Sequence, residues 1–176
     1  MFRFENLDET TRRYMLIEVE QAIATSQLHL SRRFTAQGQA RYSNLLREAV
    51  HTGNEDSLSA ALVHQQCFAE REPYGASTRR VPINAILTFA EGQFNAFYMR
   101  GVCHRAIQAG QRVEVYRAKE VLTPRPASTY QVGQQLDPQQ VLRLLRHSPS
   151  GLHRGPAVPA GFNSGLSLRL IGGPTC

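Results

Sequence analysis

Hydrophobic residues recur at helical spacing through the first seventy positions of the chain. Short polar segments separate these runs, and Asn6 to Glu9 has the spacing of an N-terminal capping box. Residues 27–34 alternate briefly and are expected to form a connector or a short extended piece. The pattern predicts three amphipathic helices, over residues 8–24, 35–50 and 57–69.

A stretch rich in proline, glycine and serine, residues 72–78, then interrupts the helical pattern. Such a composition is typical of a loop. We expect this loop to join two lobes, residues 1–72 and 80–176, of a single domain, since 176 residues is close to the usual size of one domain.

Helical spacing returns after this loop. Pro82 suits the first turn of a helix, and Glu91-Gly92 is expected to kink or interrupt it. Asp137-Pro138 combines an acidic cap with proline at the first helical position. The predicted helices of this half cover residues 83–90, 93–109 and 137–146.

Strand periodicity is confined to two short segments. Residues 112–119 alternate between apolar and polar side chains, and residues 166–170 predict a final strand that could pair with them. The predicted fold class is α+β, with a helical N-terminal half, a long central helix, and a small basic sheet-and-loop region in the C-terminal half.

Composition narrows the class of protein further. The hydrophobic share of 41% predicts a packed core, and no run approaches the roughly 20 apolar residues that cross a bilayer. The first residues contain no apolar stretch, so we expect no secretory signal, no membrane association and a cytoplasmic protein. The three cysteines lie far apart, which favours reduced thiols over a disulfide framework.

Charge is unevenly distributed along the chain. Of the 20 basic residues, Lys119 is the only lysine, and guanidinium groups are suited to phosphate and carboxylate. Residues 1–73 hold eight arginines and ten acidic residues, whereas residues 74–120 hold seven basic and three acidic ones. Residues 121–176 add five arginines and one acidic residue. This asymmetry indicates contact with a polyanion, or with the acidic surface of a second subunit.

The first candidate site lies on the predicted helix 93–109. At 100° per residue its apolar side chains share one broad arc with Arg105 at its centre, while Arg100 and His104 lie on a flank of that arc. An unpaired buried charge is costly, so Arg105 either extends its stem to solvent or forms a buried ion pair with Glu18, Glu48 or Glu91. The alternative is that it lines a cleft and binds an anion, with Gly101 leaving room for the ligand.

The second candidate site is the basic strand. Arg117 and Lys119 point to one face of it and Tyr116 to the other, with Arg125 and Ser128 following shortly after. Two cations and an aromatic ring suit contact with a phosphate backbone and a base. An ordinary solvated edge strand carries charge too, and that alternative stays open.

A third candidate is the segment 161–165. Its glycines, with Asn163 and Ser164, could form a nest of backbone N–H groups for an anion, although a tight turn has the same composition. The complete set of candidate ligand-binding residues is Tyr98, Arg100, His104, Arg105, Tyr116, Arg117, Lys119, Arg125, Ser128, Asn163 and Ser164.

Sequence signatures of enzymes are largely missing. No Walker A, GxSxG or HExxH pattern occurs, and the cysteines and histidines do not cluster at zinc-ligand spacing. We therefore expect neither a metal nor a cofactor. The Tyr116-Arg117 pair is similar to the opening arginine of ADP-ribosyltransferases, but that chemistry needs a later glutamate, and Glu120 is the last one.

Three hypotheses of function follow. The first is a non-enzymatic module that binds nucleic acid or another phosphate-rich ligand through its arginines. The second is a self-assembling protein in which the acidic N-terminal half of one copy contacts the basic C-terminal half of another. The third is an enzyme acting on a nucleotide or nucleic acid, with a base chosen from Glu91, Glu114 and Glu120.

Four segments also carry a resemblance. The segments EGQFNAFYMRGVCHRAI, VYRAKEVLTPRPAS and FNSGLSLRL, together with TRRYMLIEVE near the front, resemble a group of small bacterial proteins. The similarity covers most of the chain and implies a bacterial or phage origin. It implies no activity, cofactor or fold.

Overall fold

The computed structural model describes residues 1–123, 126–147 and 165–171, and these form the predicted α+β fold. No helix in these ranges is long and apolar enough to cross a bilayer. The elements are α1 (Glu9–Ala24), α2 (Ala36–Thr52), α3 (Glu55–His64), β1 (Arg71–Tyr74), β2 (Ser77–Arg80), α4 (Ala85–Ala109), β3 (Val113–Arg117), α5 (Pro126–Thr129), β4 (Gln135–Leu136), α6 (Pro138–His147) and β5 (Leu166–Leu170).

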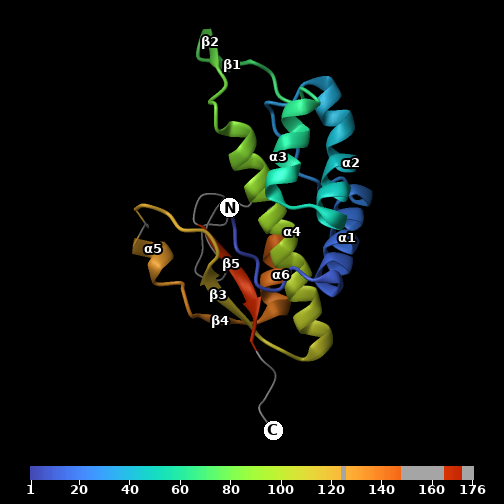
Figure 1. Ribbon diagram of the computed structural model, residues 1–176, viewed down its shortest axis with the longest axis vertical. Helices are drawn as coiled ribbons and strands as arrows, with labels where there is room; N and C mark the ends of the chain where they lie inside the picture. Colours follow the sequence, from blue (N-terminus) through green and yellow to red (C-terminus); the bar gives the residue numbers. More distant parts are fainter. Residues whose placement is uncertain (124–125, 148–164, 172–176) are drawn as a thin grey trace.

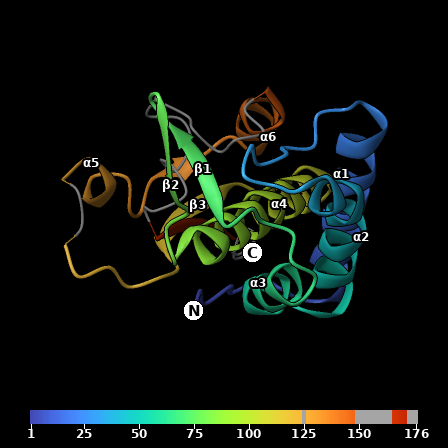
Figure 2. The same cartoon turned by 90° about the horizontal axis from the view of Figure 1, so that it is seen from above.

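Helix α4 is the centre of the molecule (Figure 1). It contacts α1, α3, α6 and β5, and one hydrophobic cluster joins residues of α1, α2 and α3 to residues of β3, α6 and β5. Seen from above, α1, α2 and α3 lie on one side of α4 and the sheet on the other (Figure 2). The core therefore extends across both of the expected lobes.

The expected break at Glu91-Gly92 does not occur, and α4 runs without interruption for 25 residues. Glycine inside a helix costs about 1 kcal/mol relative to alanine. Every residue from Ala90 to Cys103 is buried, however, and burial of the large side chains among them offsets that cost. Tertiary packing overrides the local helix-breaking tendency.

Gly101 allows α1 and α4 to pack closely. A Cβ atom at this position would lie 2.6 Å from Cγ of Met15 and 3.0 Å from the carbonyl oxygen of Thr11. Any side chain larger than hydrogen would therefore push the two helices apart. Gly101 makes room for α1, not for a ligand.

The front helices begin at capping side chains. Asp8, rather than Asn6, caps α1 by accepting a hydrogen bond from the Thr11 amide at 2.9 Å. Asn54 and Ser57 form a capping box, so α3 begins two residues earlier than expected. It ends at His64 and not at residue 69, because the chain turns after it and pairs Phe68 with Phe34 in an isolated bridge.

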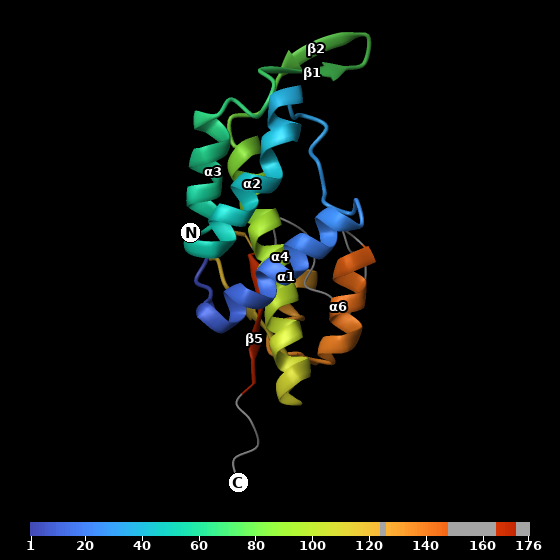
Figure 3. The ribbon, with the colours of Figure 1, turned by 90° about the vertical axis from the view of Figure 1, so that its right-hand side faces the viewer.

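The expected loop 72–78 is instead part of a β-hairpin, with its turn at Gly75 and Ala76. Strands β1 and β2 pair antiparallel, with Arg71 opposite Arg80, and Gly75 adopts a positive φ of 58° in the turn. The hairpin projects beyond the helices at one end of the molecule (Figures 1 and 3). Neither of its faces is packed on the core, so its sequence shows no apolar alternation.

The predicted pairing of the two C-terminal strands is confirmed. β3 pairs antiparallel with β5, and β4 adds a third strand on the other side of β3. Glu114 lies opposite Arg169 in this register, and the two side chains form an ion pair at 2.6 Å. The third strand supplies the support that two strands alone lack.

We predict that Gly101→Ala lowers the free energy of unfolding by about 1–3 kcal/mol, because the added methyl group overpacks the α1–α4 contact. Urea denaturation measures this change. The control is Gln108→Ala, an exposed position on the same helix, which should be close to neutral. Equal stability of Gly101→Ala and the control would contradict the close packing.

Candidate functional site

Arg105 does not lie at the centre of the apolar face of α4. Its side chain is 28% exposed and forms an ion pair with Asp8 at 2.5 Å and a hydrogen bond with Thr11 at 3.1 Å. Arg100 is the buried arginine of this helix, with 3% of its surface exposed. The prediction from the apolar arc therefore exchanged the burial of Arg100 and Arg105. The middle of α4, where Arg100 lies, is buried on nearly all sides, so the arc of apolar residues does not mark the buried face there.

Arg100 is enclosed by the end of α6. Its Nη2 donates to the carbonyl oxygen of Leu145 at 2.5 Å, and its guanidinium lies 4.8 Å from the centroid of the Phe97 ring. Its Nε has no hydrogen-bond partner among the described residues. Burial lowers the pKa of Arg100 to about 10, which still leaves it charged at neutral pH.

Glu18 compensates this buried charge. It is 1% exposed and accepts two hydrogen bonds from Arg146, at 2.6 and 3.0 Å. Nδ1 of His104 lies 3.4 Å from the same carboxylate, and the His104 ring packs on Tyr14. The buried ion pair expected for Arg105 is therefore formed by Glu18 and Arg146. This cluster holds α1, α4 and α6 together.

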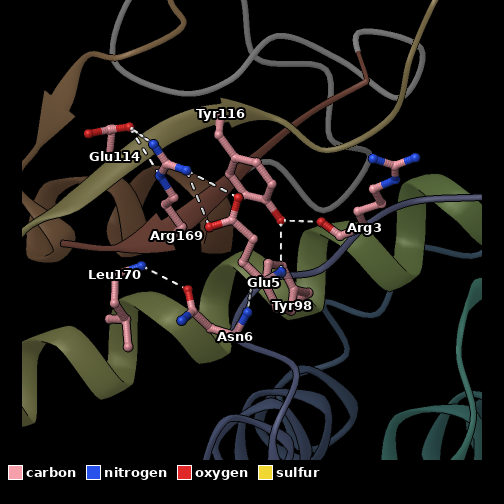
Figure 4. Close-up of polar contacts among 8 residues, drawn as sticks. All are labelled: Arg3, Glu5, Asn6, Tyr98, Glu114, Tyr116, Arg169 and Leu170. Carbon is pink, nitrogen blue, oxygen red and sulfur yellow. Dashed lines mark hydrogen bonds and ion pairs between the residues drawn. The ribbon is translucent and has the colours of Figure 1, made fainter. Parts of the chain in front are cut away.

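Tyr98 and Tyr116 are buried and bind the N-terminal segment of the chain (Figure 4). The Tyr116 hydroxyl donates to the carbonyl oxygen of Arg3 at 2.7 Å, and the Tyr98 hydroxyl accepts from the Asn6 amide at 3.0 Å. Burial raises the pKa of both phenols. These two tyrosines attach the N-terminal segment and present no ring to a ligand.

The remaining candidates are divided between several places. Ser128 is buried within α5, and Arg125, Asn163 and Ser164 lie outside the described residues. Lys119 forms an ion pair with Glu91 and lies 5.9 Å from the Phe2 ring centroid. The eight candidates that the structure describes therefore do not form one shared surface.

Arg117 and Lys119 do come together beside a row of adjoining cavities. With Arg3 and Glu120 they line a cavity of about 290 Å³. Lys119 also lines the next cavity, of about 300 Å³, together with Asn84 and Thr88 of the α4 region.

Asn84 and Thr88 line a third cavity as well, of about 330 Å³, which lies at the base of the hairpin. Shared residues thus link the three cavities in a row. The row runs from the basic strand β3 to the β1–β2 hairpin.

The hairpin carries basic residues that the sequence analysis did not select. Arg71, Arg79 and Arg80 are exposed on it, and Tyr74 is 61% exposed with the Arg79 guanidinium 4.5 Å from its ring centroid. The detectable signal was the arginines placed on both sides of Gly75. The loop-like composition of residues 72–78 conceals this signal.

Glu72 in strand β1 is engaged in two ion pairs. Glu72 accepts hydrogen bonds from Arg33 at 2.5 Å and from Arg79 at 2.8 Å, and these contacts lower the pKa of its carboxyl group. Residues 28–41 and 64–84, which form the hairpin and its base, contain six arginines and two glutamates. We call these two segments the hairpin end. Its net charge is positive.

The described residues do not assemble a catalytic centre that we can recognise. No group of three or more His, Cys, Asp or Glu side chains among them is arranged to hold a metal. Glu91 of α4 is paired with Lys119, and Glu114 of β3 is paired with Arg169 of β5. Burial raises the pKa of the Cys103 thiol, which disfavours the reactive thiolate.

Comparison with known proteins finds no family model, no curated protein and no solved structure that matches this chain significantly. Function therefore has to be inferred from the residues themselves.

We predict that Glu18→Gln lowers the free energy of unfolding by about 3 kcal/mol, because it leaves two arginines without a buried counter-charge. Adding Arg100→Met should recover at least about 1 kcal/mol, since one uncompensated charge is then removed. Chemical denaturation of the single and double variants measures both changes in the free energy of unfolding. If the exposed change Glu9→Gln costs as much as Glu18→Gln, the buried cluster does not stabilise the fold.

Proposed function

We propose that this protein is a non-enzymatic module that binds nucleic acid through its hairpin end. The observation that carries the proposal is a projecting β-hairpin with three exposed arginines and an exposed tyrosine. Of the basic residues first considered, Arg117 and Lys119 are the ones within the described ranges that keep a place in it, at the far end of the row of cavities. Arg100 and Arg105 serve the fold instead.

The charge pattern of the hairpin favours a phosphate ligand. Arg71 and Arg80 lie directly opposite each other, and like charges in this position destabilise a strand pair. Arg71 is held in place by hydrogen bonds to the side chain and the carbonyl oxygen of Thr78, both at 3.0 Å. An anion between the two guanidinium groups would relieve their repulsion and accept their forked hydrogen bonds.

An extended ligand fits better than an isolated anion. The arginines continue from the hairpin to Arg33 at its base, and the row of cavities leads on to Lys119 and Arg117. The exposed ring of Tyr74 adds a surface on which a base can stack. Cations that follow a backbone, combined with aromatic rings, are typical of nucleic-acid binding.

Head-to-tail assembly has less support. That hypothesis needs a free acidic surface on the front half, but many of its carboxylates are engaged within the chain. Glu18 pairs with Arg146, Asp8 with Arg105, Glu20 with Arg47 and Glu72 with Arg33.

We predict that the double variant Arg71→Gln, Arg80→Gln binds a labelled 20-nucleotide DNA about tenfold more weakly than the wild type at low salt. Fluorescence anisotropy over a series of salt concentrations measures this. The slope of log K, where K is the association constant, against the logarithm of the salt concentration should decrease in magnitude by roughly 1–2, because two phosphate contacts are lost.

The matched control is Arg13→Gln, Arg143→Gln, which removes the same charge from exposed positions on α1 and α6. It should bind nearly as well as the wild type. An equal loss in the control would mean that only net charge matters. Wild-type protein that fails to bind DNA or RNA at low salt would refute the proposed function.

A further inference from the structure

We infer that the cavity at the base of the hairpin accommodates a single nucleobase, so that the nucleic acid bound is single-stranded. This inference rests on the proposed function and specifies its ligand. The cavity has a volume of about 330 Å³ and lies between the loop at residues 29–33, Phe68 and the first turn of α4. Its size lies at the lower end of the range for small-molecule sites, which suits one base.

Aromatic rings form the apolar part of this cavity. Phe68 and Phe89 pack edge to face at a centroid distance of 5.6 Å, and His29 lies 6.0 Å from Phe89 at an interplanar angle of 35°. Burial lowers the pKa of His29. A neutral imidazole is a flat ring against which another ring can pack.

Polar groups on the other walls match the edge of a base. The hydroxyl groups of Ser31 and Thr88 and the amide of Asn84 line the cavity, and no carboxylate lines it. Hydroxyl and amide groups can both donate and accept, as base edges require. A site with apolar walls and a few polar groups is typical of ligand binding.

Asn84 has no competing role at the start of its own helix. The side chains of Asp8, Thr35 and Asn54 each accept a hydrogen bond from the backbone of the helix that follows, whereas Asn84 makes no such bond. Its amide is therefore available to the cavity that it lines.

Arginines beside the cavity would hold the backbone of a nucleic-acid strand across its mouth. Arg33 lines the cavity and is held by Glu72 of the hairpin, so phosphate-binding groups lie directly beside it. A base in a duplex is stacked and paired, whereas a base in a single strand can turn into a pocket. A single strand can place its phosphates on the arginines and one base in the cavity without cost, whereas a duplex would first have to break a base pair.

The test fills the cavity without changing charge. Thr88→Met places a longer apolar side chain at a position that lines the cavity, and Thr10→Met makes the same substitution at an exposed site on α1. Anisotropy is measured with a 20-nucleotide single strand, the duplex of the same sequence, and a strand in which every base is replaced by an abasic site. Thermal unfolding confirms that both variants are folded.

We expect Thr88→Met to weaken binding of the single strand about tenfold, the scale of one lost stacking contact, and to leave duplex and abasic strand unchanged. Thr10→Met should match the wild type with all three. An unchanged single-strand affinity, or an equal loss with the abasic strand, would overturn the inference. Failure of the proposed function is a different result: the wild type then binds none of the three probes.

Discussion

Burial of α4 on almost every side is the constraint on which the rest of the structure depends. A helix in this position has to satisfy most of the polar groups that it carries without water, and α4 carries several. Asn95 donates to the carbonyl oxygen of Leu166 and accepts from Ser167, and Glu18 supplies the counter-charge near Arg100. The polar residues of α4 therefore determine where β5, α1 and α6 can pack.

This constraint also explains why the arginines open to a ligand lie in another part of the molecule. An arginine on a central helix forms hydrogen bonds and ion pairs with carbonyl and carboxylate groups of the same chain, as Arg100 and Arg105 do. Arginine on an isolated hairpin has no core to support, and Arg80 in β2 lies fully on the surface. The exposed hairpin is the better place to look for a ligand of opposite charge.

Sequence periodicity predicted the elements that bury one face and failed where burial was complete or absent. Residues 8–24 have a pattern because only a stripe of α1 is buried. In residues 166–170 the leucines alternate with polar residues, although Ser167 between them is buried as well. The buried middle of α4 hides its orientation, so Arg100 and Arg105 could not be distinguished. The hairpin has no buried face and therefore no alternation. Within the candidate site, the sequence indicated Arg117 and Lys119. It could not indicate the cavities, because their walls come from distant segments, as with Arg33 and Thr88, which line the same cavity.

The attachment of the N-terminal segment has a consequence for how the chain reaches its final structure (Figure 4). Asn6 accepts a hydrogen bond from the Leu170 amide, and Glu5 pairs with Arg169, so some of the earliest residues are secured by some of the last. Contacts so far apart in sequence slow folding, because a very long loop must close before they form. During synthesis the helices can collapse early, but the contacts of Glu5 and Asn6 with β5 have to wait until β5 has left the ribosome.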